Sequence, residues 1–121
     1  MKYRESEEMY LETILLLKKK KACVHSIDIA NELDYSRPSV SRAVGLLQKG
    51  GYITMAQSGE IELTEMGFQK AMDIYERHRV ITEVLMKLGA NEQVAEDNAC
   101  RIEHVISDEL MNTLKEFVNH K

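Results

Sequence analysis

The fold is best predicted from one stretch, SRPSVSRAVGLLQK, which runs from Ser36 to Lys49. Ser36 is a favourable helix N-cap, and Pro38 fits the first turn of a helix. Apolar residues then recur at helical spacing, namely Val40, Val44 and Leu47. The stretch therefore predicts a helix with a narrow apolar face and a polar, basic outer face.

A shorter helix is predicted just before this stretch, over Val24–Leu33, with Ser26 as its N-cap. Asp34 and Tyr35 make a tight turn between the two helices, as in a helix-turn-helix motif. Residues 36–52 contain three basic residues and no acidic one, in a chain of net charge −4. This local inversion of charge predicts DNA binding, because phosphate contacts supply much of the affinity for DNA. A solvated helix with a chance excess of basic residues is the alternative.

Two short strands are predicted after the second helix, over 52–55 and 60–63, around the turn Gln57-Ser58-Gly59. A hairpin in this position is the wing of a winged helix. Its tip carries Glu60 and no Arg or Lys. We therefore expect the wing to hold DNA phosphates weakly.

The rest of the chain is predicted to be helical, and the sequence contains only one Pro and six Gly. Further helices are predicted over residues 6–21, 65–88 and 91–106, and from 107 onward. The signals that begin or end them are Thr64, Gly89, Asn91 and Ser107. We expect a mainly α protein, with a winged helix-turn-helix domain at 1–71 and an all-helical metal-binding and dimerisation domain at 72–121.

Composition narrows the class of protein further. No apolar run approaches the ~18 residues of a membrane span, so no membrane protein is expected. The two cysteines, Cys23 and Cys100, lie far apart, and the chain opens without an apolar signal segment. These features predict a cytoplasmic protein with reduced thiols.

Three side chains with metal-binding atoms fall within one predicted helical turn. Cys100, Glu103 and His104 stand at i, i+3 and i+4, so a thiol, a carboxylate and an imidazole share one face. Such a mixed set suits a divalent first-row transition metal, whereas Ca²⁺ or Mg²⁺ prefers oxygen ligands alone. Another part of the chain must complete the site, and Met9 and Glu12 on the first helix are candidates. The alternatives are a core Met9 with a surface Glu12, and a buried Cys beside a surface Glu and His.

Five segments together resemble the diphtheria toxin repressor family of metal-dependent transcription regulators. They are EMYL at 8–11, SRPSVS at 36–41, LTEMG at 63–67, RHR at 77–79 and ACRIEHVISDE at 99–109. The resemblance implies a homodimer that binds double-stranded operator DNA, with a divalent metal as corepressor, and that represses metal-uptake genes. The chain stops at Lys121, so the SH3-like domain of longer members is expected to be absent.

The resemblance also implies which residues hold metal. By position, the primary site falls on Met9, Cys100, Glu103 and His104. A histidine of the second site falls on His78, with Glu83 and Glu96 as less closely matched neighbours. Glu12 takes the position of a ligand in the manganese-responsive branch. Because Met9 and Cys100 are soft donors, we expect Fe(II), and also Co(II), Ni(II) or Zn(II), to be preferred over Mn(II).

DNA contacts are expected at the start and along the outer face of the third helix. The candidate residues are Ser36, Arg37, Pro38, Ser39, Ser41, Arg42 and Lys49. A metal ion that binds Met9 together with residues 100–104 would fix the first helix. It would thereby set the separation of the two recognition helices, which must match the spacing of the operator half-sites.

Two other classes of function remain open. In one, a metal-independent winged-helix regulator senses oxidants through Cys23 or Cys100. In the other, the Cys-Glu-His set is the metal centre of a small hydrolase. The chain has no Gly-rich phosphate loop and no Ser/His/Asp order. The sequence therefore favours a regulator over an enzyme, and no small-molecule substrate is expected.

Overall fold

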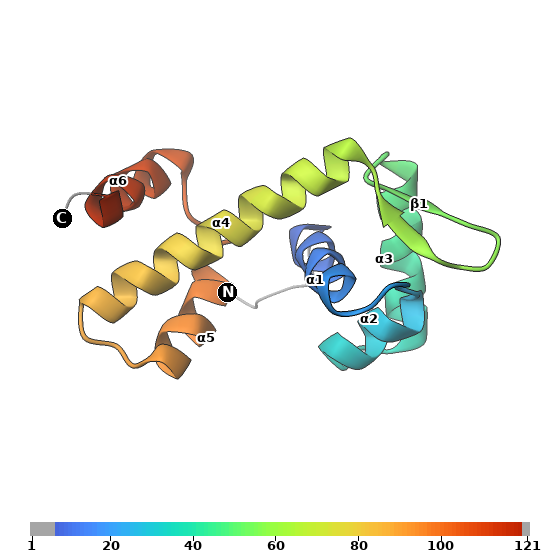
Figure 1. Ribbon diagram of the computed structural model, residues 1–121, viewed down its shortest axis with the longest axis horizontal. Coiled ribbons are helices and arrows are strands. Elements are labelled where there is room, and N and C mark those ends of the chain that lie inside the picture. Colours follow the sequence, from blue (N-terminus) through green and yellow to red (C-terminus); the bar gives the residue numbers. More distant parts are fainter. Residues whose placement is uncertain (1–6, 120–121) are drawn as a thin grey trace. The chain divides into compact units, whose positions relative to one another are not determined.

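The structure is a computed structural model, and it describes residues 7–119. It is mainly helical, as predicted, with a single two-stranded sheet among the described residues (Figure 1). The chain divides into two compact units, one ending at Met72 and the other beginning at Asp73. No helix in the described part has the length and apolar content needed to cross a membrane.

The first unit is a winged helix. Its elements are α1 (Glu7–Lys20), α2 (Ser26–Leu33), α3 (Arg37–Lys49), β1 (Ile53–Met55), β2 (Ile61–Leu63) and the beginning of α4 (Glu65–Lys87). The strands are antiparallel, with Ile53 opposite Leu63. The predicted helix-turn-helix and the hairpin after it are thus confirmed.

Local capping explains where the two helices of the motif begin. Ser36 caps α3 as predicted, because its hydroxyl oxygen accepts a hydrogen bond from the amide of Ser39 at 3.3 Å. The prediction that Ser26 caps α2 is wrong, since the N-cap is His25. The backbone amide of His25 donates to the Asp28 carboxylate at 2.8 Å, so an acid three residues downstream fixes the start of α2 one residue earlier.

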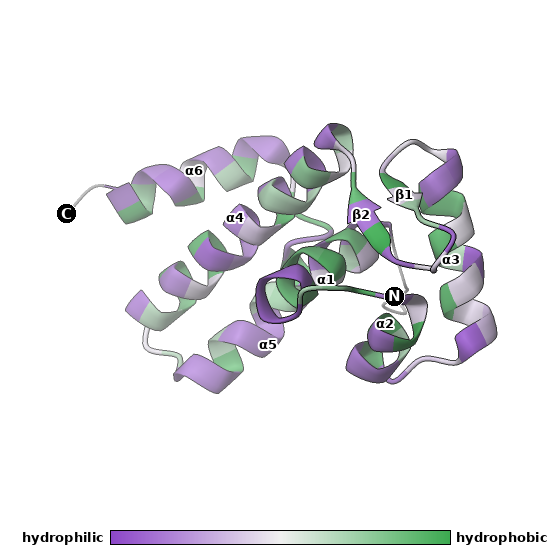
Figure 2. Cartoon of the chain, turned by 45° about the vertical axis from the view of Figure 1, so that its right-hand side comes forward, coloured by the Kyte–Doolittle hydropathy of each residue, from purple (hydrophilic) through white to green (hydrophobic). Residues whose placement is uncertain are grey.

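The core of the first unit forms between the helices and the hairpin. α1 contributes most to it, and the middle of this helix is green in Figure 2. The most deeply buried side chains are Leu11, Ile14, Val24, Ile29, Val40, Leu47, Ile53 and Ile61. The three apolar residues predicted to face inward from α3 are all buried. Burial on this side leaves the opposite face of α3 in solvent.

Two contacts fix the hairpin to the helices of its unit. The amide of Ile61 donates to the Val24 carbonyl at 2.8 Å, just before α2. The Lys18 ammonium lies 2.7 Å from the Glu62 carboxylate. The wing therefore has a defined position next to the helix-turn-helix.

The second unit consists of α4 from Asp73 onward, α5 (Glu92–Ile102) and α6 (Asp108–Asn119). Its core contains Val80, Ile81, Val84, Ala99, Met111 and Val118. Gly89 ends α4 as predicted, with a φ of 114°. The predicted caps are also confirmed, because Asn91 and Ser107 side chains accept amide hydrogen bonds at the starts of α5 and α6.

One helix is shorter than predicted. α5 ends at Ile102, whereas the sequence predicts a helix through Ile106. The carbonyl of Ile102 accepts amide hydrogen bonds from both Val105 and Ile106 at 3.0 Å, which closes the chain into a turn. The Glu103 carbonyl accepts from the Arg77 guanidinium at 3.1 Å instead of from the next helical turn. A partner from another helix thus replaces the continuation of α5.

Candidate metal centre and nucleic-acid interface

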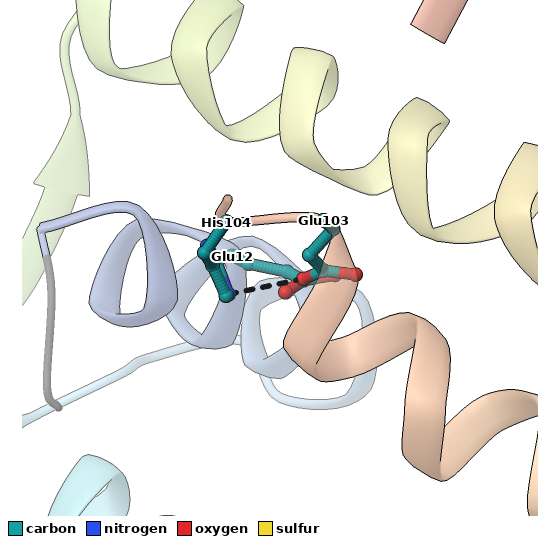
Figure 3. Close-up of side chains that lie close together, drawn as sticks. All are labelled: Glu12, Glu103 and His104. Atoms are coloured by element: carbon teal, nitrogen blue, oxygen red, sulfur yellow. Dashed lines mark ion pairs between the residues drawn. The ribbon is translucent and has the colours of Figure 1, made fainter. Parts of the chain in front are cut away.

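The second unit places a fully buried carboxylate between two imidazoles. Glu103 is the C-cap residue of α5 and is 0% exposed. Its Oε1 atom lies 2.8 Å from Nδ1 of His78 on α4, and its Oε2 atom lies 3.2 Å from Nε2 of His104. Figure 3 shows the Glu103–His104 pair at the end of α5. The structure thus brings together three of the predicted metal-site residues.

This arrangement suits a divalent transition metal. A buried carboxylate is costly unless it is hydrogen-bonded or paired, and the two imidazoles serve that purpose here. Carboxylate oxygen and imidazole nitrogen are also ordinary ligands of Fe(II), Mn(II), Co(II) and Zn(II). Glu103 and His104 therefore offer ligand atoms that fit the metal that the sequence predicts, while His78 contacts the other carboxylate oxygen of Glu103.

Cys100 lies one turn before Glu103 on α5 and is exposed. The amide of Glu103 donates to the Ala99 carbonyl at 2.9 Å, so Cys100 and Glu103 keep the helical spacing that the sequence predicts. Glu103 follows Ile102, the last residue of α5, and His104 lies in the same turn. The expectation that all three residues stand on one continuous helix is therefore wrong for Glu103, which is the C-cap, and for His104.

The candidate ligands on α1 are both buried. Met9 is 7% exposed, and its Sδ atom accepts a hydrogen bond from the Tyr35 hydroxyl at 3.8 Å. Glu12 is 9% exposed, so the alternative of a surface Glu12 is wrong. Sequence reasoning missed Tyr35 as a neighbour of Met9, because the turn between α2 and α3 gives no sequence signal for this contact.

The two acidic residues near the predicted second site differ in exposure. Glu83 is half-buried on α4, and Glu96 is exposed on α5. A residue that the sequence did not single out contacts the centre directly, since Arg77 donates to the backbone of Glu103. Its position immediately before His78, in the RHR step, was the only sequence signal for it.

The outer face of α3 carries the candidate DNA contacts. Arg37, Arg42 and Lys49 are exposed, and none of the three makes an ion pair with another described residue. Ser36, Pro38 and Ser41 are also exposed, while Ser39 is half-buried. An open groove on this face is lined by Pro38, Ser41, Arg42, Gly45, Leu46 and Lys49. Cations without acidic partners are available for phosphates or base edges.

Leu46 is a part of this face that sequence reasoning missed. It is an apolar residue that is 61% exposed, beside the buried Leu47. The 3.6-residue period turns Leu46 away from the buried row of α3. It stands one turn after Arg42, on the same groove.

Both halves of the chain match descriptions of one family. Residues 2–60 match the iron dependent repressor N-terminal DNA binding domain, and residues 64–121 match the iron dependent repressor metal binding and dimerisation domain. Among solved structures, the manganese regulator SloR is similar, with a TM-score of 0.85 and 27% identity. That comparison covers 98% of this chain and 55% of SloR.

Curated relatives agree with this assignment. An uncharacterized HTH-type transcriptional regulator of Methanocaldococcus jannaschii is 33% identical, over 94% of this chain and 93% of the relative. The iron-dependent repressor IdeR of Mycobacterium tuberculosis is 32% identical, over 96% of this chain and 51% of the relative. The chain thus spans nearly all of the former and about half of the latter. The chain belongs to the iron-dependent repressor family, that of the diphtheria toxin repressor, whose members are transcription regulators and not enzymes.

Proposed function

We propose that this chain is a metal-dependent repressor that binds operator DNA as a homodimer, with Fe(II) or another divalent transition metal as corepressor. The observation that carries the proposal is the buried Glu103 carboxylate between His78 and His104. It lies in the part of the chain that matches a metal-binding and dimerisation domain. When bound, the metal supplies positive charge and a fixed link between its ligands.

The proposed ligands come from three helices and one turn. They are Met9 and Glu12 on α1, His78 on α4, Cys100 on α5, and Glu103 and His104 in the turn that follows. Support from the structure is strongest for His78, Glu103 and His104, because each imidazole has a ring nitrogen within 3.2 Å of the Glu103 carboxylate. Met9, Glu12 and Cys100 are included because of the family resemblance. The soft sulfur donors Met9 and Cys100 favour Fe(II), Co(II), Ni(II) or Zn(II) over Mn(II).

The proposed DNA-binding surface is the outer face of α3 with its N-terminal turn. Arg37 and Arg42 project from a helix whose opposite face is buried, and the segment carries no acidic residue. The residues assigned to the major groove are Arg37, Ser39, Ser41 and Arg42, while Ser36 and Lys49 are assigned to the phosphate backbone. Because a repressor must reach its operator DNA, the proposal places the protein in the cytoplasm. By the family resemblance, its proposed targets are metal-uptake genes.

The decisive experiment is binding of the full chain to labelled promoter DNA at one fixed salt concentration. Fe(II), under anaerobic conditions, Mn(II), Co(II), Ni(II) and Zn(II) are titrated separately into the metal-free protein. We expect at least one metal to induce tight binding that a chelator reverses, and Cys100→Ala to lose this response. Equal affinity with and without metal would contradict the proposal.

A thiol-sensing regulator is the second candidate, because Cys23 and Cys100 are both exposed, as oxidant-sensitive thiols must be. The same assay separates the two candidates. Thiol sensing predicts DNA affinity that changes with oxidant and is insensitive to chelator. Metal sensing predicts the reverse.

A further inference from the structure

We propose that Arg77 is a positioning residue of the candidate metal centre, in that it holds the backbone of Glu103 while His78 holds the carboxylate. This inference rests on the proposed metal-binding function. Arg77 and His78 are consecutive residues of α4, and each makes a hydrogen bond to Glu103. One helix thus holds the buried acid at two points, its carbonyl and its side chain.

The two contacts restrain different degrees of freedom. The Arg77 guanidinium donates to the Glu103 carbonyl oxygen at 3.1 Å, which fixes the main chain at the end of α5. His78 Nδ1 lies 2.8 Å from Glu103 Oε1, which fixes the direction of the side chain. A carboxylate is well placed as a ligand only when both its backbone and its rotamer are fixed.

Arg77 also fixes the other end of the turn between α5 and α6. Its second guanidinium nitrogen donates to the Asp108 carboxylate, in the first residue of α6, at 3.0 Å. The turn between Glu103 and Asp108 contains His104. A single guanidinium, with its rigid fork of donors, therefore spans the segment that holds two of the candidate ligands.

The contact to Glu103 is the one that matters for positioning. The Asp108 side chain is 89% exposed, and an ion pair in water contributes little. The Arg77 side chain is only 18% exposed, and the Glu103 carbonyl is one of the last carbonyls of α5, which have no partner within their own helix. A charged donor at a helix C-terminus is favourable for the helix dipole as well.

A test uses Co(II) titration of the full chain, followed by its visible absorption. Arg77→Met keeps the apolar stem but removes every donor. We expect this variant to bind Co(II) about 10- to 100-fold more weakly, as is typical when a residue that orients a metal ligand is lost. We also expect its d–d absorption bands to shift, because the ligand geometry changes. Arg77→Lys restores one donor and should recover much of the affinity.

Two control variants isolate the contact. Asp108→Asn weakens only the exposed ion pair and should bind Co(II) as the unmodified chain does. Arg79→Met removes a neighbouring arginine that pairs with Glu76 at 2.9 Å on the exposed side of α4, and it should also leave the affinity unchanged. Melting temperatures in EDTA identify any variant that fails to fold.

The outcomes separate this inference from the proposed function. If the unmodified chain binds no metal, the proposed function fails and this inference fails with it. If the unmodified chain binds Co(II) and folded Arg77→Met binds it equally well with the same spectrum, the positioning role alone is wrong. If Asp108→Asn loses as much affinity as Arg77→Met, the role belongs to the α6 contact instead. Should Arg77→Met fail to fold, Arg77→Lys and Asp108→Asn still test the inference, because a large loss of Co(II) affinity in either folded variant would contradict it.

Discussion

Nδ1 of His78 lies 2.8 Å from Oε1 of Glu103, so a half-buried imidazole on α4 satisfies a carboxylate that has no exposed surface. In the metal-free protein this contact is a structural hydrogen bond. In the metal-bound form that we propose, the same two side chains serve as ligands, so the proposal makes stability of the metal-free form and metal affinity depend on shared atoms.

Replacing His78 should destabilise the metal-free protein. His78→Phe keeps a ring but removes the hydrogen bond to buried Glu103, and we expect the free energy of unfolding to fall by about 1–3 kcal/mol. Urea unfolding in EDTA measures this change. Arg79→Ala, at an exposed site one residue away, should change it by less than about 0.5 kcal/mol. Equal stability of His78→Phe and the unmodified chain would mean that Glu103 has sufficient partners without His78.

Metal preference should follow the hardness of the donors. Met9 and Cys100 offer sulfur, whereas Mn(II) prefers oxygen ligands. Exchanging both for carboxylates, in Met9→Asp with Cys100→Glu, should raise the response to Mn(II) relative to that to Co(II) or Fe(II). Metal-dependent DNA binding, measured for each metal at one salt concentration, tests this ranking. An unchanged ranking would show that these two sulfurs do not bind the metal.

Two glycines should respond to alanine in opposite directions. A Cβ atom at Gly67 would lie 1.9 Å from the Tyr52 carbonyl oxygen, which itself accepts the Thr64 amide at 3.0 Å. Gly67→Ala must displace this backbone, and we expect a loss at or above the upper end of the roughly 1–3 kcal/mol typical of overpacking.

Gly45 is the matched control, because it lies inside α3 and no atom beyond its own stretch of helix comes within 4 Å of the place a Cβ atom would take. Gly45→Ala should stabilise the protein by roughly 0.5–1 kcal/mol, since alanine loses less backbone entropy in a helix. Thermal or urea unfolding of both variants provides the comparison. A Gly67→Ala variant as stable as the unmodified chain would contradict the close approach of α4 to Tyr52.

The sequence is sufficient to predict structural features that depend only on residues close together along the chain. The predicted N-caps at Ser36, Asn91 and Ser107 are confirmed, because a side chain that caps a helix lies within three residues of the amide it accepts from. The predicted cap of α2 at Ser26 is wrong, because Asp28 stabilises His25 as the N-cap. Serine is the more favourable N-cap by residue type. The hydrogen bond from the His25 amide to the Asp28 carboxylate nevertheless makes His25 the N-cap.

Features that depend on tertiary partners are less predictable. The predicted end of α5 lies four residues too late, because the Arg77 contact to Glu103 joins residues 26 positions apart. The spacing of Cys100, Glu103 and His104 is enough to identify them as candidate ligands. The partnership of Glu103 with His78 cannot be derived from spacing, and only the family resemblance brings His78 into the candidate set.

Acid should weaken two contacts that fix the start of α2 and the wing. The hydrogen bond from Lys21 lowers the pKa of Asp28 below its ordinary value of 3.8, and the hydrogen bond from Lys18 lowers the pKa of Glu62 below 4.5. A folded-state pKa below the unfolded value adds stability above the unfolded pKa, and that stability is lost as the pH falls through the folded pKa. Asp28→Asn should therefore reduce the loss of stability between about pH 5 and pH 3, as measured by urea unfolding. Because both carboxylates are near solvent, the effect should shrink in high salt. A pH profile identical to that of the unmodified chain would contradict the Lys21 contact.

DNA affinity should separate base contacts from phosphate contacts on α3. Arg42 stands in the middle of the exposed groove, where an arginine can donate two hydrogen bonds to guanine O6 and N7. Arg42→Ala should weaken binding to a cognate operator by about 1–3 kcal/mol and reduce discrimination at one base pair.

Lys49, at the C-terminal end of α3, should contact a phosphate. Lys49→Ala should then weaken binding to all sequences alike and lower the slope of log affinity against log salt by about one. Titrations of operator and scrambled DNA at several salt concentrations distinguish the two patterns. If Arg42→Ala lost affinity equally for both DNAs, Arg42 would be a phosphate contact, and the base-reading role would pass to another residue of this groove.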